Sequence, residues 1–166
     1  PTPNHIDRWV RQFEASVQIP MLEELSYVLE RTYLSKSRVA SMLSQVLRDP
    51  QLVGDDPRSF WQGTRLLELP SKGTSQREML ALVIQHISRE YGISARDCGE
   101  TAGSFVYLDD ALFSGATVRH QLTAWIQSQA PQKIVLHIVM LAMHRSGKYY
   151  AEGALRKAAR EAEKTI

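Results

Sequence analysis

The sequence predicts an α/β protein in which a parallel sheet follows a helical N-terminal region. Up to about residue 49, apolar residues recur at steps of three and four, the period of helices that pack on one face. From residue 64 onward, short apolar runs alternate with helical patterns, which indicates βαβ units with parallel pairing and right-handed crossovers. We therefore expect a helical region over residues 1–54 and an α/β core over residues 55–166.

Composition limits the classes of function. The chain has 166 residues, 43% of them hydrophobic, which is enough for one core. The 20 Lys and Arg nearly balance the 18 Asp and Glu, so nucleic-acid binding is not indicated. Cys98 is the single cysteine, which excludes an internal disulfide, and no Cys/His cluster has the spacing of a zinc site.

No segment of the sequence is expected to enter a membrane. There is no signal-peptide pattern, and His137, His144 and Arg145 interrupt or close the most hydrophobic stretch. We expect a soluble, cytoplasmic protein. Because the chain begins with Pro1 and stops in a charged helical pattern at Ile166, we expect it to be a piece of a longer polypeptide.

Three amphipathic helices are expected between Asn4 and Asp49. Pro20 suits the first turn of the second helix, and Ser35 or Ser37 can cap the third. Their apolar stripes are interpreted first as packing surfaces of the fold. The alternative is a contact with a protein partner, or self-association through these N-terminal helices.

The α/β core is expected to contain three strands that alternate with helices. The expected order is strand 64–69, loop 70–75, helix 76–91, an undefined stretch 93–104, strand 105–108, helix 115–129, strand 133–143 and a helix from about 149. The last strand is a near-continuous apolar run, which suggests burial on both faces. Ligands of such sheets bind at the carboxyl ends of the strands, so the loops 70–76, 109–117 and 144–148 should converge.

Two acids follow the central strand. Asp109 and Asp110 are adjacent, so they point to opposite sides and cannot form a close catalytic pair. From a loop after the strand they can still approach two neighbouring hydroxyls of a ribose. The alternative for an isolated acid pair is that one caps the loop or meets a Lys or Arg, while the other is solvated.

A candidate phosphate turn follows the acids, at the point where a loop becomes a helix. It consists of Ser114, Gly115, Ala116 and Thr117. Backbone N–H groups at a helix start bind anions, Gly115 permits close approach, and the Ser114 and Thr117 hydroxyls can donate. Alone this could be an ordinary helix cap, but joined to the acids it indicates a ribose phosphate site.

The run from Phe105 to Thr117 resembles the phosphoribosyl pyrophosphate signature of type I phosphoribosyltransferases. The resemblance implies a three-layer phosphoribosyltransferase-like core with a parallel sheet. It also implies that the catalytic acids Asp109 and Asp110 hold the ribose, while Ser114 to Thr117 wrap the 5′-phosphate. Ser114 stands where Thr is commoner in the family.

Two further loops fit the same scheme. Lys72, Gly73, Thr74 and Ser75 lie where the family places its pyrophosphate loop, and they offer a charge, a close backbone approach and two hydroxyls. The alternative is a polar loop in which Thr74 or Ser75 caps the helix. In the third loop, Arg145 could meet an anion and Tyr149 could stack on a base, although tyrosines at a helix start are more often packing residues.

The wider pattern resembles the phosphoribosyltransferase-like (PRTase-CE) domains of bacterial conflict and anti-phage systems. Besides the signature, this resemblance rests on the pair Phe60-Trp61 and on the segment from Lys72 to Leu80. The sequence departs from active phosphoribosyltransferases in three respects. It has no long hairpin before the signature, no final strand after the last helix and no evident base-recognition hood.

The resemblance implies a domain that binds phosphoribosyl pyrophosphate or a related nucleotide, and transfer or cleavage of a ribosyl group if the domain is catalytic. Mg²⁺ would be bound mainly through substrate oxygens and water, with Asp109 and Asp110 as candidate contributors. Catalysis is open, because the hood is missing. The alternatives are a non-catalytic sensor of a ribose phosphate or nucleotide, and a scaffold module.

Overall fold

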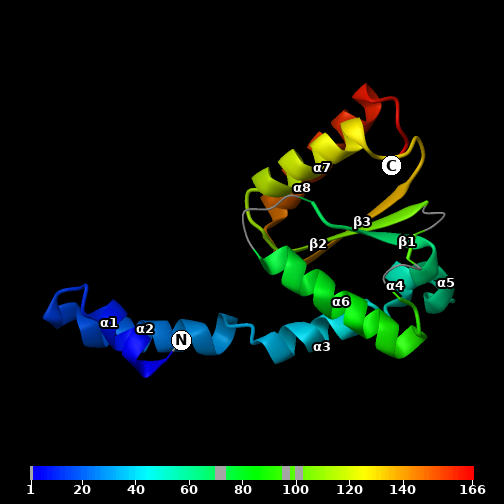
Figure 1. Ribbon diagram of the computed structural model, residues 1–166. Helices are drawn as coiled ribbons and strands as arrows, with labels where there is room; N and C mark the ends of the chain where they lie inside the picture. The colour runs from blue at the N-terminus through cyan, green and yellow to red at the C-terminus, as the bar shows by residue number, and fades with distance from the viewer. Residues whose placement is uncertain (1, 70–73, 95–97, 100–102) are drawn as a thin grey trace. The chain divides into compact units, whose positions relative to one another are not determined.

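The computed structural model describes residues 2–69, 74–94, 98–99 and 103–166 (Figure 1). Backbone contacts divide the chain into two compact units, Pro1–Val39 and Ala40–Ile166. This boundary lies earlier in the chain than residue 54, where the sequence suggested a division. Across the described ranges, no helix is both long and apolar enough to cross a membrane.

The first unit is helical, as expected, but the helix boundaries differ from the prediction. Helix α1 spans Pro3–Val10, and the Thr2 hydroxyl caps it by accepting from the His5 amide. Helix α2 spans Ala15–Thr32, so Pro20 lies inside this helix rather than in its first turn. A proline inside a helix removes one intrahelical hydrogen bond and crowds the carbonyl four residues earlier, here that of Ser16.

Most large apolar side chains of the first unit are exposed. Val10 is the buried residue of α1, and the fully described α2 has none. Ile19 is 68% exposed and Tyr33 is 58% exposed. These helices therefore gain little from burial within the chain, although helices of this length depend on packing for their stability.

Short capped helices lead into the sheet. Helix α3 spans Lys36–Val46, and the Ser35 hydroxyl accepts from the Arg38 amide, which confirms one of the two expected caps. Helices α4, Pro50–Val53, and α5, Pro57–Gln62, begin at the aspartate caps Asp49 and Asp56.

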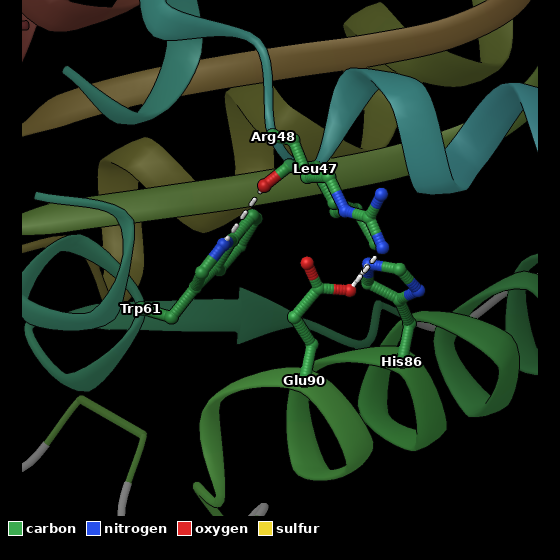
Figure 2. A network of polar contacts seen from close by, with 5 residues as sticks. All are labelled: Leu47, Arg48, Trp61, His86 and Glu90. Atoms are coloured by element: carbon green, nitrogen blue, oxygen red, sulfur yellow. Dashed lines mark hydrogen bonds and ion pairs between the residues drawn. The ribbon is translucent and has the colours of Figure 1, made fainter. Parts of the chain in front are cut away.

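Figure 2 shows how α6, Ser75–Tyr91, contacts the segment that follows α3. Glu90 pairs with Arg48, and the Nε2 atom of His86 lies 3.2 Å from Glu90 Oε2, without the alignment of a hydrogen bond. Beside this network, the buried Trp61 donates its indole N–H to the Leu47 carbonyl over 3.2 Å. The ion pair is partly exposed, so the packing of the buried Trp61 contributes more to stability.

The second unit contains a three-stranded parallel sheet in the order β1-β2-β3, which confirms the predicted α/β class. Strand β1 spans Thr64–Leu67, β2 spans Ser104–Leu112 and β3 spans Val135–Met143. The prediction ended β2 at residue 108, which was wrong, because its pairing with β3 continues to Leu112 opposite Met143. The same pairing places Tyr107 between Leu67 of β1 and Ile138 of β3.

Helices cover both faces of the sheet in three layers. Helices α7, Ala116–Ser128, and α8, Arg145–Glu161, lie together on one face, and α6 covers β2 from the other (Figure 1). Residues from α7 and α8 form one core with the buried Tyr107 of β2. The last helix begins at Arg145 rather than near residue 149, so the predicted third loop is reduced to His144.

Strand β3 is less buried than predicted. It lies at the edge of the sheet, and its side chains are half-buried or exposed, because the described chain provides one neighbouring strand rather than two. Leu136, Ile138 and Met140 pack against the core that α7 and α8 form. Before β3 begins, Lys133 forms an isolated parallel bridge with Thr165, where the chain returns after α8.

Candidate functional site

The two acids lie within β2, not in a loop after it. Asp109 is half-buried and Asp110 is exposed. Since side chains alternate along a strand, Asp109 shares the face of Tyr107, towards α7 and α8, and Asp110 projects from the opposite face. The expectation of opposite orientations therefore holds, but the loop that was to bring both acids to one ribose is absent from this stretch.

Asp109 is held by a buried tyrosine. The Tyr107 hydroxyl lies 3.0 Å from Asp109 Oδ2 and 2.7 Å from the Gln121 side-chain oxygen on α7, and its single proton can be donated to one of them at a time. Burial, and next the negative charge of Asp109, raise the pKa of Tyr107 well above its usual value. Tyr107 therefore remains a protonated donor that orients the carboxylate.

Both carboxylates also accept from the backbone that follows them. Asp109 Oδ1 accepts from the Asp110 amide over 2.9 Å, and Asp110 Oδ1 accepts from the Ala111 amide over 2.7 Å. These bonds fix the first torsions of each side chain and leave further lone pairs on each carboxylate for a ligand.

The candidate phosphate turn joins β2 to α7. Gly115 is the cap residue, with a left-handed φ of 72°, and α7 begins at Ala116. The Ser114 hydroxyl accepts from the Ala116 amide over 3.3 Å, which is the capping role that the sequence left as an alternative. Ser114 and Thr117 are exposed, so both hydroxyls and the start of α7 are accessible to an anion.

Close backbone packing joins this turn to the start of α8. A Cβ atom on Gly115 would lie 2.7 Å from the Gly147 carbonyl oxygen. The His144 amide also donates to the Leu112 carbonyl over 2.8 Å. The second and third predicted loops therefore converge at the carboxyl edge of the sheet, as expected.

The third contributor to this edge is the start of α6. Lys72 and Gly73 lie outside the described residues, so the structure places only part of the predicted pyrophosphate loop. Thr74 is exposed at the cap position of α6 and makes no side-chain cap bond, and Ser75 is the first residue of the helix.

Comparison with known proteins decides the family. The model of the PRTase-CE family matches residues 6–165 of the 166-residue chain. The chain belongs to the PRTase-CE family. No curated protein and no solved structure gives a significant match. The membership establishes a phosphoribosyltransferase-like domain, consistent with the parallel sheet and its two helical layers.

In this PRTase-CE domain, the two residues suggested for base recognition stand on α8. Arg145 is exposed at the first position of that helix. Tyr149 is 75% exposed, and its ring meets Tyr150 edge-on at 5.7 Å. Within the described ranges, no hydrogen bond or ring contact links either residue to Asp109 or Asp110, so a base-binding role stays a prediction.

The acids of the candidate site do not form a metal cage with other described residues. Among the residues that the structure describes, no group of three or more His, Cys, Asp or Glu side chains could hold a metal ion. Asp109 and Asp110 project from opposite faces of β2, so each could offer oxygen to a cation on its own side only. A role for Mg²⁺ stays a prediction, in which the ion would be held mainly by the oxygens of a phosphorylated ligand, with Asp109 or Asp110 as a contributor.

Two residues that position parts of the candidate site were not predicted from the sequence. Tyr107 orients Asp109, and its place two residues earlier on the same strand was the available signal. Gln76 is 3% exposed and bonds to the backbone of both Leu69 and Leu108. Its signal was a polar residue in the apolar stripe of α6, in register with Met79 and Val83.

Proposed function

We propose that this PRTase-CE domain binds phosphoribosyl pyrophosphate, or a related nucleotide, at the carboxyl edge of β2. The observation that carries the proposal is the continuity of the acid pair with the phosphate turn. Asp109 and Asp110 lie in β2. The turn that follows this strand leads through the cap residue Gly115 into α7, and the start of this helix faces solvent. Acids suit ribose hydroxyls, and a helix start suits a phosphate.

In this proposal each element receives one part of the ligand. The α7 start, with Ser114 and Thr117, takes the 5′-phosphate. Asp109, oriented by Tyr107, accepts hydrogen bonds from ribose hydroxyls on its own face of β2, and Asp110 can offer oxygen to a cation on the other face. Thr74 and Ser75, with Lys72 and Gly73, take the pyrophosphate or the second phosphate group. Membership of the family supports the ligand class, and we propose a role in anti-phage defence from the same resemblance.

If the domain is catalytic, the reaction is transfer of the phosphoribosyl group. The bond from C1′ to the pyrophosphate oxygen breaks, the electron pair leaves on the pyrophosphate, and the acceptor atom forms the new bond to C1′. The residues of the chain orient the sugar and place negative charge near the positively charged transition state. Bound Mg²⁺ would neutralise charge on the leaving pyrophosphate.

A second candidate is a sensor that binds the same ligand without turnover. The orientation of the acids favours it, since Asp109 and Asp110 project from opposite faces and each already accepts a backbone hydrogen bond. The measurement that separates the two functions is release of pyrophosphate or free base. Release by the native chain and loss of release in Asp110→Asn support an enzyme, while tight binding without release supports a sensor.

Isothermal titration tests the binding proposal itself. Phosphoribosyl pyrophosphate with Mg²⁺ is expected to bind the native chain, and Asp109→Asn and Asp110→Asn are expected to weaken binding by about tenfold each. Asp55→Asn changes an exposed acid in the turn before α5 and serves as the matched control. Absence of Mg²⁺-dependent binding of the native chain would refute the proposal.

We also infer that the N-terminal helices associate with the same helices of a second copy. Their exposed aromatic and aliphatic residues include Tyr27, which is 57% exposed, and Val28, which is 47% exposed. From residue 23 to residue 38 the charges are segregated, because Glu23, Glu24 and Glu30 precede Arg31, Lys36 and Arg38. Two copies in antiparallel arrangement would place the acidic half of each against the basic end of the other.

Light scattering of the purified chain tests this inference. We expect the mass of a dimer, and we expect Val28→Asp to give a monomer with unchanged helix content. Glu24→Arg and Arg31→Glu should each weaken the dimer, whereas an equimolar mixture of these two variants should associate again. A native chain that stays monomeric at high concentration contradicts the inference.

A further inference from the structure

Gln76 is a buried polar side chain at the start of α6. It is 3% exposed, and a buried amide is costly unless its donor and its acceptor are both paired. Both are paired here. The side-chain oxygen accepts from the Leu69 amide over 3.3 Å, and the side-chain nitrogen donates to the Leu108 carbonyl over 3.1 Å.

These two bonds join the parts of the chain that border the proposed site. Leu69 follows β1, Leu108 immediately precedes Asp109, and Gln76 itself follows Thr74 and Ser75. The β1–β2 pairing ends with Leu67 opposite Tyr107. Beyond this pair, the Gln76 amide contacts the backbone of both segments and takes the place of a further backbone hydrogen bond between them.

We infer that Gln76 is the positioning residue that fixes the α6 start relative to the acids of β2. The inference rests on the proposed function and deepens it. Gln76 is buried, so it acts through the backbone of Leu69 and Leu108 rather than on a ligand. It sets the separation between the hydroxyls of Thr74 and Ser75, on one side, and the carboxylates of Asp109 and Asp110, on the other.

The two backbone partners of residue 76 require a side chain that accepts from the Leu69 amide and donates to the Leu108 carbonyl. Gln76→Glu keeps the shape, and a protonated carboxyl group still donates to the Leu108 carbonyl. An ionised carboxylate has no proton and faces the carbonyl oxygen with like partial charge. Burial and this carbonyl both favour the neutral form, so the variant should carry its proton at mildly acidic pH and lose it as the pH rises.

The experiment is isothermal titration of phosphoribosyl pyrophosphate with Mg²⁺ at several pH values between about 5 and 8, where a displaced carboxyl pKa can be reached. Affinity is compared with the native chain at each pH and corrected for the folded fraction, measured by circular dichroism. We expect Gln76→Glu to bind within about threefold of the native chain at the acidic end and about tenfold more weakly at the basic end. Gln76→Met keeps the volume without hydrogen bonds, so it should weaken binding at every pH.

Gln85→Glu is the matched control, because it makes the same substitution at an exposed position of the same helix. It is expected to follow the native chain throughout. The inference is overturned if Gln76→Glu follows the native chain at all pH values, or if it weakens binding equally at all of them.

Failure of the native chain to bind would instead refute the proposed function. The position of Gln76 is then judged without a ligand, by hydrogen exchange of the native chain and of Gln76→Met. Faster exchange in the variant at both Leu69 and residues 109–112 supports the coupling of α6 to the acid strand. Unchanged exchange in both segments overturns it.

Discussion

Gly147 at the start of α8 lies directly against the backbone of Phe113, the residue before the phosphate turn. A Cβ atom on Gly147 would lie 2.0 Å from the Phe113 carbonyl oxygen, so no side chain fits without movement. Helix α8 and the phosphate turn are thus fitted to each other through backbone atoms.

We expect Gly147→Ala to lower the free energy of unfolding by ~1–3 kcal/mol, because the first turn of α8 must move away from Phe113. Urea unfolding measures the change. Gly153→Ala is the control, since Gly153 lies in the same helix with no atom within 4 Å of an added Cβ. That control should instead stabilise the protein by about 1 kcal/mol, the usual gain of alanine over glycine in a helix. Equal effects of the two variants would contradict the close contact.

Gly115→Ala tests the geometry of the phosphate turn. The residue combines a φ of 72° with an added-Cβ distance of 2.7 Å to the Gly147 carbonyl oxygen. Gly92, at the end of α6, has a similar φ of 68° with open space around it. Gly92→Ala should therefore cost about 1 kcal/mol for conformation alone, and Gly115→Ala should cost more and also weaken ligand binding. Unfolding and titration measurements on the pair isolate the contribution of the contact.

Tyr107→Phe should separate the orientation of Asp109 from the packing of the ring. Loss of the hydroxyl leaves the Gln121 and Asp109 oxygens without this donor, and a cost of about 1–2 kcal/mol is expected. Tyr150→Phe, at a 61% exposed position, is the control and should have little effect.

The raised pKa of Tyr107 also predicts a loss of stability in alkali. The folded protein holds the neutral phenol, while the unfolded chain ionises at the usual pKa of 10.0. Stability from this group is therefore complete below pH 10.0 and decreases as the pH rises above it. Tyr107→Phe should show a smaller decrease over the same range, and identical alkaline profiles would disprove this assignment.

His137 predicts that the stability of the fold also decreases in acid. Burial lowers the pKa of this histidine below its usual 6.5, and its ring meets Phe60 edge-on at 5.5 Å. Below pH 6.5 the unfolded chain binds more protons than the folded one, so stability should decrease as the pH falls through this range. His137→Phe should remove this part of the acid sensitivity, as measured by unfolding at a series of pH values. A variant with unchanged acid sensitivity would contradict the prediction.

Local sequence patterns predicted which helices and strands form more accurately than they predicted where these elements end. The parallel class, the glycine at the end of α6 and the turn at Gly115 follow from local residue preferences, and the structure confirms them. The end of β2 does not, because its last residues are extended by pairing with β3, which is distant in sequence. The partial burial of β3 likewise depends on how many strands lie beside it, which an apolar run does not encode.

In the candidate site, too, local features could be predicted from the sequence and features that depend on distant strands could not. The types of the site residues and their order were visible in the sequence, whereas the placement of Asp109 and Asp110 inside a strand depended on β3. Gln76 was missed because its partners are backbone atoms of Leu69 and Leu108, and backbone atoms leave no trace in a sequence pattern. Its position in an apolar stripe was the remaining clue.

The hydrogen bonds from the Asp110 and Ala111 amides give the protein two internal probes of contact at its acids. Each amide donates to the carboxylate of the preceding residue, so its NMR resonance should shift when a ligand or a cation meets that carboxylate. The Asp110 amide reports on Asp109, and the Ala111 amide reports on Asp110. An NMR screen of small molecules can therefore follow contact at the two acids separately, before any ligand has been identified.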